Sequence, residues 1–139
     1  ALPAVSAAEK LQVGQALAAT GQTVWVSQER DLDAVTALSG SGPAYVFYFM
    51  EAMMAAGEKL GLSAAQAKQL TLATFAGAAH LACASPESPA TLRERVTSKG
   101  GTTYAALTTM QAADVAGSID AAMHQAAARA AELGQEFGK

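Results

Sequence analysis

Two long stretches with almost no charge constrain this chain most strongly. Residues 69–85 contain no charged side chain, and residues 44–57 contain only Glu51. Apolar residues fall on all sides of the helices that these stretches predict, and a helix that is apolar on every face must be covered on every face. We therefore expect a partner subunit to cover the apolar helix faces that a single chain of this size cannot bury.

Lipid is the other environment that could cover such helices. Residues 44–57 are too short, because a helix needs about 20 apolar residues to cross a bilayer. Residues 69–85 are rich in Ala, Thr and Gly and include His80. The sequence thus disfavours a lipid-associated helical protein, and release without detergent would discard it.

The composition favours helices and limits the partners. Hydrophobic residues make up 51% of the chain but aromatic residues only 6%, so alanine dominates, and alanine is the best helix former. The net charge is −3 and no basic patch stands out, so we expect no nucleic acid partner. A single cysteine, Cys83, cannot form an internal disulfide. With no signal peptide pattern at the start, this predicts a cytoplasmic protein.

Capping signals predict where the helices begin and end. Ser6 with Glu9 and Ser63 with Gln66 are capping boxes, and Ser88 can cap the helix that Pro89 opens. Gly61 is expected to end the longest early helix, into which Pro43 fits at the first turn. The predicted helices are 6–19, 31–38, 43–60, 64–84, 89–96, 102–110 and 118–137, with a break at 40–43.

One short segment breaks the helical pattern. Thr23 to Ser27, with the sequence TVWVS, is β-branched and aromatic, which predicts a strand. A lone strand has no partner in this chain. It would have to pair with another chain, or with a sheet that this sequence does not contain.

The last predicted helix carries a heptad-like seam. Its apolar residues repeat with spacings of four and three, and its alanines permit close helix approach. This favours a bundle between subunits, and a core helix within one monomer is the alternative. The seam consists of Ile119, Met123, Ala126, Ala130, Leu133 and Phe137.

Most familiar catalytic patterns are missing. His80 and His124 are the only histidines and have no ligand at metal-binding spacing, so we expect no metal. His80 is expected in a core, and His124 is expected to pair with Asp120. The segment 39–42 lacks both the spacing of a nucleophile elbow and the third glycine of a dinucleotide fingerprint.

A glycine loop is the best candidate for a binding site. Gly100 and Gly101 would fold the backbone so that the amides of Gly101, Thr102 and Thr103 point outward at a helix start. Free amides and the helix dipole bind anions of carboxylate or phosphate size. Ser98 and Thr103 add hydroxyls, and Lys99 adds charge. A plain glycine turn with a threonine cap is the alternative.

Three stretches together resemble a known family. The sequence LDAVTALSGSGPAYVF (32–47), then GEKLGLS (57–63) and LRERVTSKGGTT (92–103), is similar to the C-terminal half of pyrroline-5-carboxylate reductase. The resemblance implies an all-α bundle that forms an interleaved dimer, like the C-terminal domain of 6-phosphogluconate dehydrogenase. It also implies reduction of 1-pyrroline-5-carboxylate to L-proline with NADPH or NADH.

The resemblance also implies roles for individual residues. Ser98, Gly100, Gly101 and Thr102 would bind the substrate carboxylate. Thr103 would bind the ring nitrogen and act as the catalytic residue by helping to deliver the proton. Ser41, Gly42 and Pro43 would lie near the nicotinamide. Residues 1–28 would end a Rossmann domain and residues 29–139 would form the dimerisation and substrate domain.

Two residues depart from the family's usual pattern. Lys99 stands where proline is usual, which could loosen the loop or attract the carboxylate more strongly. Tyr104 replaces a more usual aliphatic residue and would narrow the pocket. No nucleotide-binding βαβ unit is present in the sequence, so we expect the chain by itself neither to bind NADPH nor to turn over. The alternative function is a purely structural oligomerisation module of another Rossmann-type reductase.

Overall fold

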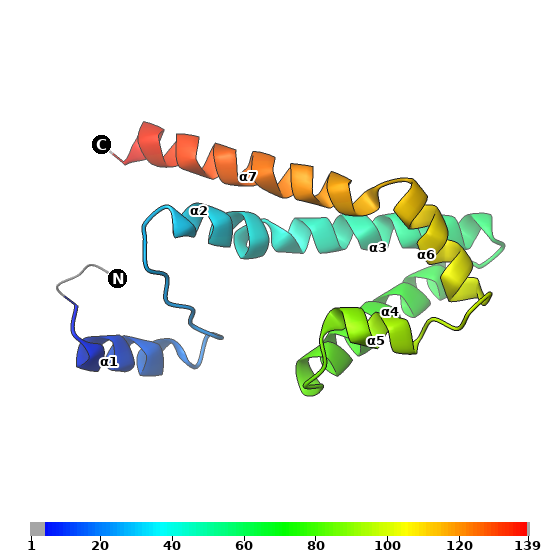
Figure 1. Cartoon of the computed structure of the whole chain (residues 1–139), viewed down its shortest axis with the longest axis horizontal. Coiled ribbons are helices and arrows are strands. Elements are labelled where there is room, and N and C mark those ends of the chain that lie inside the picture. The colour runs from blue at the N-terminus through cyan, green and yellow to red at the C-terminus, as the bar shows by residue number, and fades with distance from the viewer. Residues whose placement is uncertain (1–4, 139) are drawn as a thin grey trace. The chain divides into compact units, whose positions relative to one another are not determined.

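The computed structural model describes residues 5–138, and every regular element in that range is a helix (Figure 1). The all-α prediction is confirmed. The described chain divides into two compact units, residues 5–40 with 124–138 and residues 41–123. No helix of the described part is long and apolar enough to cross a membrane.

The first unit begins with α1 (Ala7–Leu17). Its capping box is confirmed: the Ser6 amide donates to Glu9 Oε2 at 2.8 Å, and the Glu9 amide donates to Ser6 Oγ at 3.3 Å. These bonds satisfy two of the amides that a helix start leaves free. The helix ends two residues before the expected Ala19.

The strand predicted at 23–27 is wrong. Residues 22–26 form no regular element, and no strand lies anywhere in 5–138 to pair with them. The β-strand propensity of a residue mainly reflects how its side chain packs on a sheet. Such residues therefore do not form a strand where no partner strand is present. Trp25 instead lies beside α1, with Lys10 Nζ 5.8 Å from its ring centroid.

The N-terminal segment of the first unit ends with two short helical elements. Helix α2 (Asp31–Val35) passes directly into the π-helix η1 (Thr36–Gly40). The predicted break at 40–43 is therefore a change of helical winding, and Ser41 keeps a right-handed helical conformation. Within the helix, Ala37 is 2% exposed.

The second unit begins with an antiparallel helix pair, α3 (Gly42–Lys59) and α4 (Ala64–Ala84). Gly61 has φ +101°, and the amides of Gly61 and Leu62 donate to the carbonyls of Glu58 and Gly57. These two bonds form a Schellman motif, so Gly61 ends α3 as predicted. Ser63 and Gln66 then start α4 with the predicted capping box.

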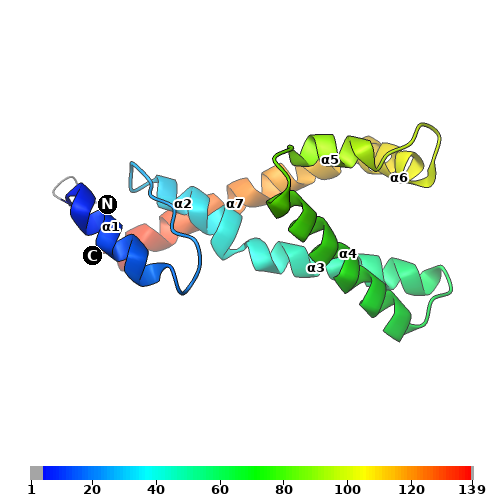
Figure 2. The ribbon, with the colours of Figure 1, turned by 90° about the horizontal axis from the view of Figure 1, so that it is seen from below.

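Small residues let α3 and α4 come together (Figures 1 and 2). A β-carbon added to Gly57 would lie 3.3 Å from that of Ala67, which is tighter than usual contact. Ala67 and Thr71 are the only buried residues of the unit 41–123. The unit therefore has hardly any core of its own.

Three further helices complete the chain: α5 (Pro89–Arg95), α6 (Thr102–Ala112) and α7 (Val115–Phe137). Ser88 caps α5 as predicted, accepting from the Thr91 amide at 3.2 Å. The last helix begins three residues before the predicted Ser118. Asp114, with φ +48°, caps it by accepting from the Gly117 amide at 3.2 Å.

The two apolar helices leave large side chains uncovered. On α3, Phe47 is 60% exposed and Tyr48 71%, and on α4 Leu70 is 56% exposed. Single exposed apolar residues are ordinary, but such a series on adjacent helices marks an interaction surface. This is the structural counterpart of the two stretches with almost no charge.

Candidate functional site

The loop between α5 and α6 is held firmly on its N-terminal side. Thr97 Oγ1 donates to the Arg93 carbonyl at 2.6 Å, and the Thr97 amide donates to the Glu94 carbonyl at 3.0 Å. Both bonds satisfy carbonyls at the end of α5, which would otherwise need water. The Thr97 hydroxyl therefore serves the helix and is not available to a ligand.

Ser98 to Gly101 then form a tight turn. The Gly101 amide donates to the Ser98 carbonyl at 3.0 Å, and Gly100 in the third position has φ +73°. A positive φ at this position is the mark of a type II turn, which favours glycine there. Gly100 is thus needed for its conformation.

Gly101 is needed for a different reason. Its φ of −80° suits any residue, but a β-carbon there would collide with Ser98 Oγ and lie 3.2 Å from the Ser98 carbonyl oxygen. The Ser98 side chain is therefore folded back over the start of α6. The Gly101 amide donates within the turn, and the residue leaves space for the Ser98 side chain. Its role in binding a ligand stays a prediction.

The first turn of α6 leaves donors available. No hydrogen bond within residues 5–138 uses the amides of Thr102, Thr103 or Tyr104 or the hydroxyls of the two threonines. In contrast, the hydroxyls of Thr108 and Thr109 on the same helix donate hydrogen bonds to backbone carbonyls. Thr103 is half-buried, whereas Thr102 is exposed. Together with Ser98 Oγ, which lies against the neighbouring Gly101, these groups can hold a small anion.

Ser41, Gly42 and Pro43 lie away from this loop. They form the N-terminal end of α3, whereas the loop lies toward its C-terminal end in both views (Figures 1 and 2). The structure therefore does not bring the two predicted segments together within one chain. Among residues 5–138 there is no strand and no βαβ unit at this helix start.

The histidines and the cysteine do not form a second site. His80 is exposed in the single chain, so the prediction of a core position is wrong for the chain by itself. His124 is also exposed, and its pairing with Asp120 stays a prediction. Among residues 5–138, no three side chains of His, Cys, Asp or Glu gather to hold a metal ion. Cys83 is a free, exposed thiol.

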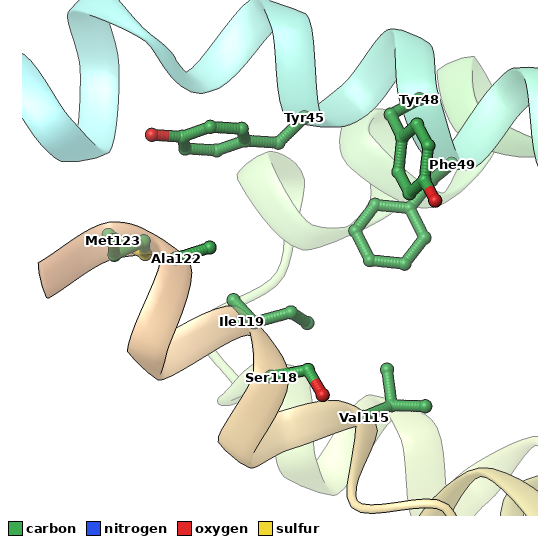
Figure 3. Close-up of a pocket in the computed structure, with 8 residues that line it drawn as sticks. All are labelled: Tyr45, Tyr48, Phe49, Val115, Ser118, Ile119, Ala122 and Met123. Atoms are coloured by element: carbon green, nitrogen blue, oxygen red, sulfur yellow. The ribbon is translucent and has the colours of Figure 1, made fainter. Parts of the chain in front are cut away.

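One feature had no signal in the sequence. A cavity of about 370 Å³ opens between α3 and the first turns of α7 (Figure 3). The Tyr45 hydroxyl is buried and has no hydrogen-bond partner among the described residues. The other polar groups of the lining are the hydroxyls of Tyr48 and of Ser118, and the latter donates to the Asp114 carbonyl. It consists of Tyr45, Tyr48, Phe49, Val115, Ser118, Ile119, Ala122 and Met123.

Known proteins resemble this chain closely. It is 50% identical over 135 residues to the pyrroline-5-carboxylate reductase of Pseudomonas aeruginosa, covering 97% of this chain and 50% of the relative. The reductase structure from Coxiella burnetii matches with a TM-score of 0.91 at 39% identity, over 94% of this chain and 48% of that one. The Plasmodium falciparum reductase, solved with NADP bound, matches with a TM-score of 0.81 at 30% identity, over 91% and 48%.

The chain thus spans about half the length of the relatives that it matches. The model of one family, described as pyrroline-5-carboxylate reductase dimerisation, matches residues 29–133. That range includes the helix pair α3 and α4, the glycine loop and most of α7. The chain belongs to the pyrroline-5-carboxylate reductase dimerisation family.

Proposed function

We propose that this chain serves as the substrate-binding and dimerisation part of a pyrroline-5-carboxylate reductase. The reaction would reduce the imine of 1-pyrroline-5-carboxylate to L-proline, with hydride from NADPH or NADH. The observation that carries the proposal is the group of unused donors around the glycine loop, in a chain of this family. That donor group suits the carboxylate that substrate and product share.

In this proposal the loop binds the substrate carboxylate through hydrogen bonds. The amides of Thr102 and Thr103 and the hydroxyl of Ser98 donate to its oxygens, assisted by the positive end of α6. Gly100 gives the turn its conformation, and Gly101 gives Ser98 the space to lie over the helix start. This arrangement needs no group of unusual pKa, because a carboxylate is charged at neutral pH.

Thr103 is proposed to serve the ring nitrogen. Its half-buried hydroxyl has no partner within the described chain, so it can bond the imine or amine nitrogen. Reduction adds a hydride to the imine carbon and a proton to this nitrogen. Thr103 would orient the imine and help to deliver that proton. The rate enhancement would come mainly from holding the imine carbon in position to accept the hydride.

We also propose that the chain functions as a homodimer. Within residues 41–123 only Ala67 and Thr71 are buried, although large apolar side chains line α3 and α4. A domain without its own core is stable only if another surface covers these side chains. A second copy presents the same apolar helices, so it is a self-complementary partner.

A titration of ¹⁵N-labelled chain with L-proline tests the loop assignment. We expect saturable shifts of the Thr102 and Thr103 amides, weakened by Thr103→Ala. Thr108→Ala is the matched control, because Thr108 lies on the same helix with its hydroxyl bonded internally. Shifts that are absent, or that Thr108→Ala weakens equally, would overturn the assignment.

A further inference from the structure

We propose that Lys99 is an electrostatic affinity determinant, which strengthens capture of the substrate carboxylate in a salt-dependent way. The inference rests on the carboxylate site assigned above. It concerns a residue that contributes nothing to the turn's hydrogen bonding.

The turn does not need proline at position 99 in order to form. It is closed by the bond from the Gly101 amide to the Ser98 carbonyl at 3.0 Å. Gly100 supplies the positive φ, and the contact with Ser98 fixes Gly101. Position 99 is the second residue of a type II turn, where proline is favoured for its φ alone. Lysine in this position therefore leaves the turn closed.

The ammonium group of Lys99 is uncommitted. Lys99 is exposed, and it forms no ion pair or hydrogen bond with any of residues 5–138. In contrast, Arg95, the other cation nearest in sequence, is bound to Glu87 at 2.6 Å. The charge of Lys99 is thus available to a molecule outside the chain.

The loop and α6 contain no acidic residue, and the acidic residues that flank them in the sequence are Glu94 and Asp114. Residues 95–113 include the whole loop and α6, and they contain no Asp or Glu. The chain as a whole carries a net charge of −3, so the loop is a positive region on a negative molecule. Such a region attracts small anions and holds them more tightly at low ionic strength.

The expected effect is modest, because Lys99 is exposed. Exposed charge pairs are worth a factor of about 1.5 to 5 in equilibrium constant. We therefore expect Lys99→Gln to weaken binding of L-proline about two- to fivefold at low salt. The difference from the original chain should vanish at about 0.5 M salt, where screening is strong.

The test compares ligands and variants in the same chain by NMR titration. L-proline and cyclopentanecarboxylate both carry the carboxylate, whereas L-prolinamide lacks it. Lys99→Arg should bind like the original chain because it keeps the charge. Lys68→Gln removes an exposed lysine on α4, far from the loop in sequence, and is the matched control.

Lys99→Pro distinguishes the effect of the charge at position 99 on ligand affinity from the effect of a stiffer turn. It removes the cation and favours the same turn, so the inference predicts weaker binding than in the original chain at low salt. Binding that is equal or tighter in Lys99→Pro and Lys99→Gln would overturn the role of Lys99 and leave the carboxylate site intact. Failure of both carboxylates to bind the original chain at low salt would overturn the site and this inference together.

Discussion

The hydroxyl oxygen of Ser98 lies in the space that a β-carbon on Gly101 would occupy. The two residues are therefore fitted to each other, and the Ser98 side chain can lie over the start of α6 only because residue 101 is glycine. The Ser98 carbonyl oxygen, 3.2 Å from the same position, adds to the restriction. The missing β-carbon at Gly101 therefore determines where the Ser98 hydroxyl, a proposed donor to the substrate carboxylate, can lie.

Gly101→Ala is expected to destabilise the chain and to displace the Ser98 hydroxyl. Alanine is also a poorer N-cap than glycine, so the free energy of unfolding should fall by about 1–2 kcal/mol. Removing the hydroxyl with Ser98→Ala should relieve part of this cost. Urea unfolding of both single variants and the double variant measures the coupling. Strictly additive losses would contradict the steric relationship.

The cap of α1 is expected to depend on pH. Hydrogen bonds from the Ser6 amide and then its hydroxyl lower the pKa of Glu9. A carboxyl whose pKa is lower in the folded chain stabilises it at higher pH, and this contribution is lost as the pH falls through the lowered pKa. The Glu9 side-chain NMR signal followed against pH gives this pKa. Ser6→Ala keeps the amide and removes the hydroxyl, so it should raise this pKa only in part, and an unchanged pKa would contradict a contribution from the hydroxyl.

A charge in the seam of α7 is expected to split the proposed dimer. Ala126→Glu places a carboxylate among the apolar residues of the seam, where a desolvated charge is costly. Ala128→Glu makes the same change two positions along, on the opposite side of the helix. Sedimentation should show monomer for the first variant and dimer for the second. Equal behaviour would place the interface elsewhere.

The chain by itself is expected neither to bind NADPH nor to oxidise it. The described residues lack the strand and glycine turn that hold a dinucleotide pyrophosphate. Fluorescence titration with NADPH should give no saturable signal, and added 1-pyrroline-5-carboxylate should cause no loss of absorbance at the nicotinamide band. Saturable binding of NADPH would contradict this prediction.

The local signals in this sequence were sufficient for most of the helices. Ser6, Ser63 and Ser88 start helices as predicted, and Gly61 ends one. Each of these signals acts within about four residues, so the chain segment itself holds both partners of every bond. The glycine loop was found in the same way, because its positive φ and its following helix are local properties.

The strand at 23–27 was mispredicted because its partner would have to come from elsewhere in space. The cap at Asp114 was missed although aspartate is a favoured N-cap, because Ser118 offers a competing helix start four residues later. The burial predicted for His80 failed because cover for a helix face depends on a neighbouring surface. The errors at 23–27 and at His80 share one cause, which is dependence on groups distant in the sequence.

The sequence by itself determined the helical class, the helix starts and the position of the loop, because these follow from contacts between near neighbours along the chain. Only the tertiary structure decided that the Ser98 hydroxyl takes the space beside Gly101 and that α3 and α4 leave Phe47 and Leu70 exposed. The physical reason is that steric fit and burial depend on distances in space, which residue order does not specify.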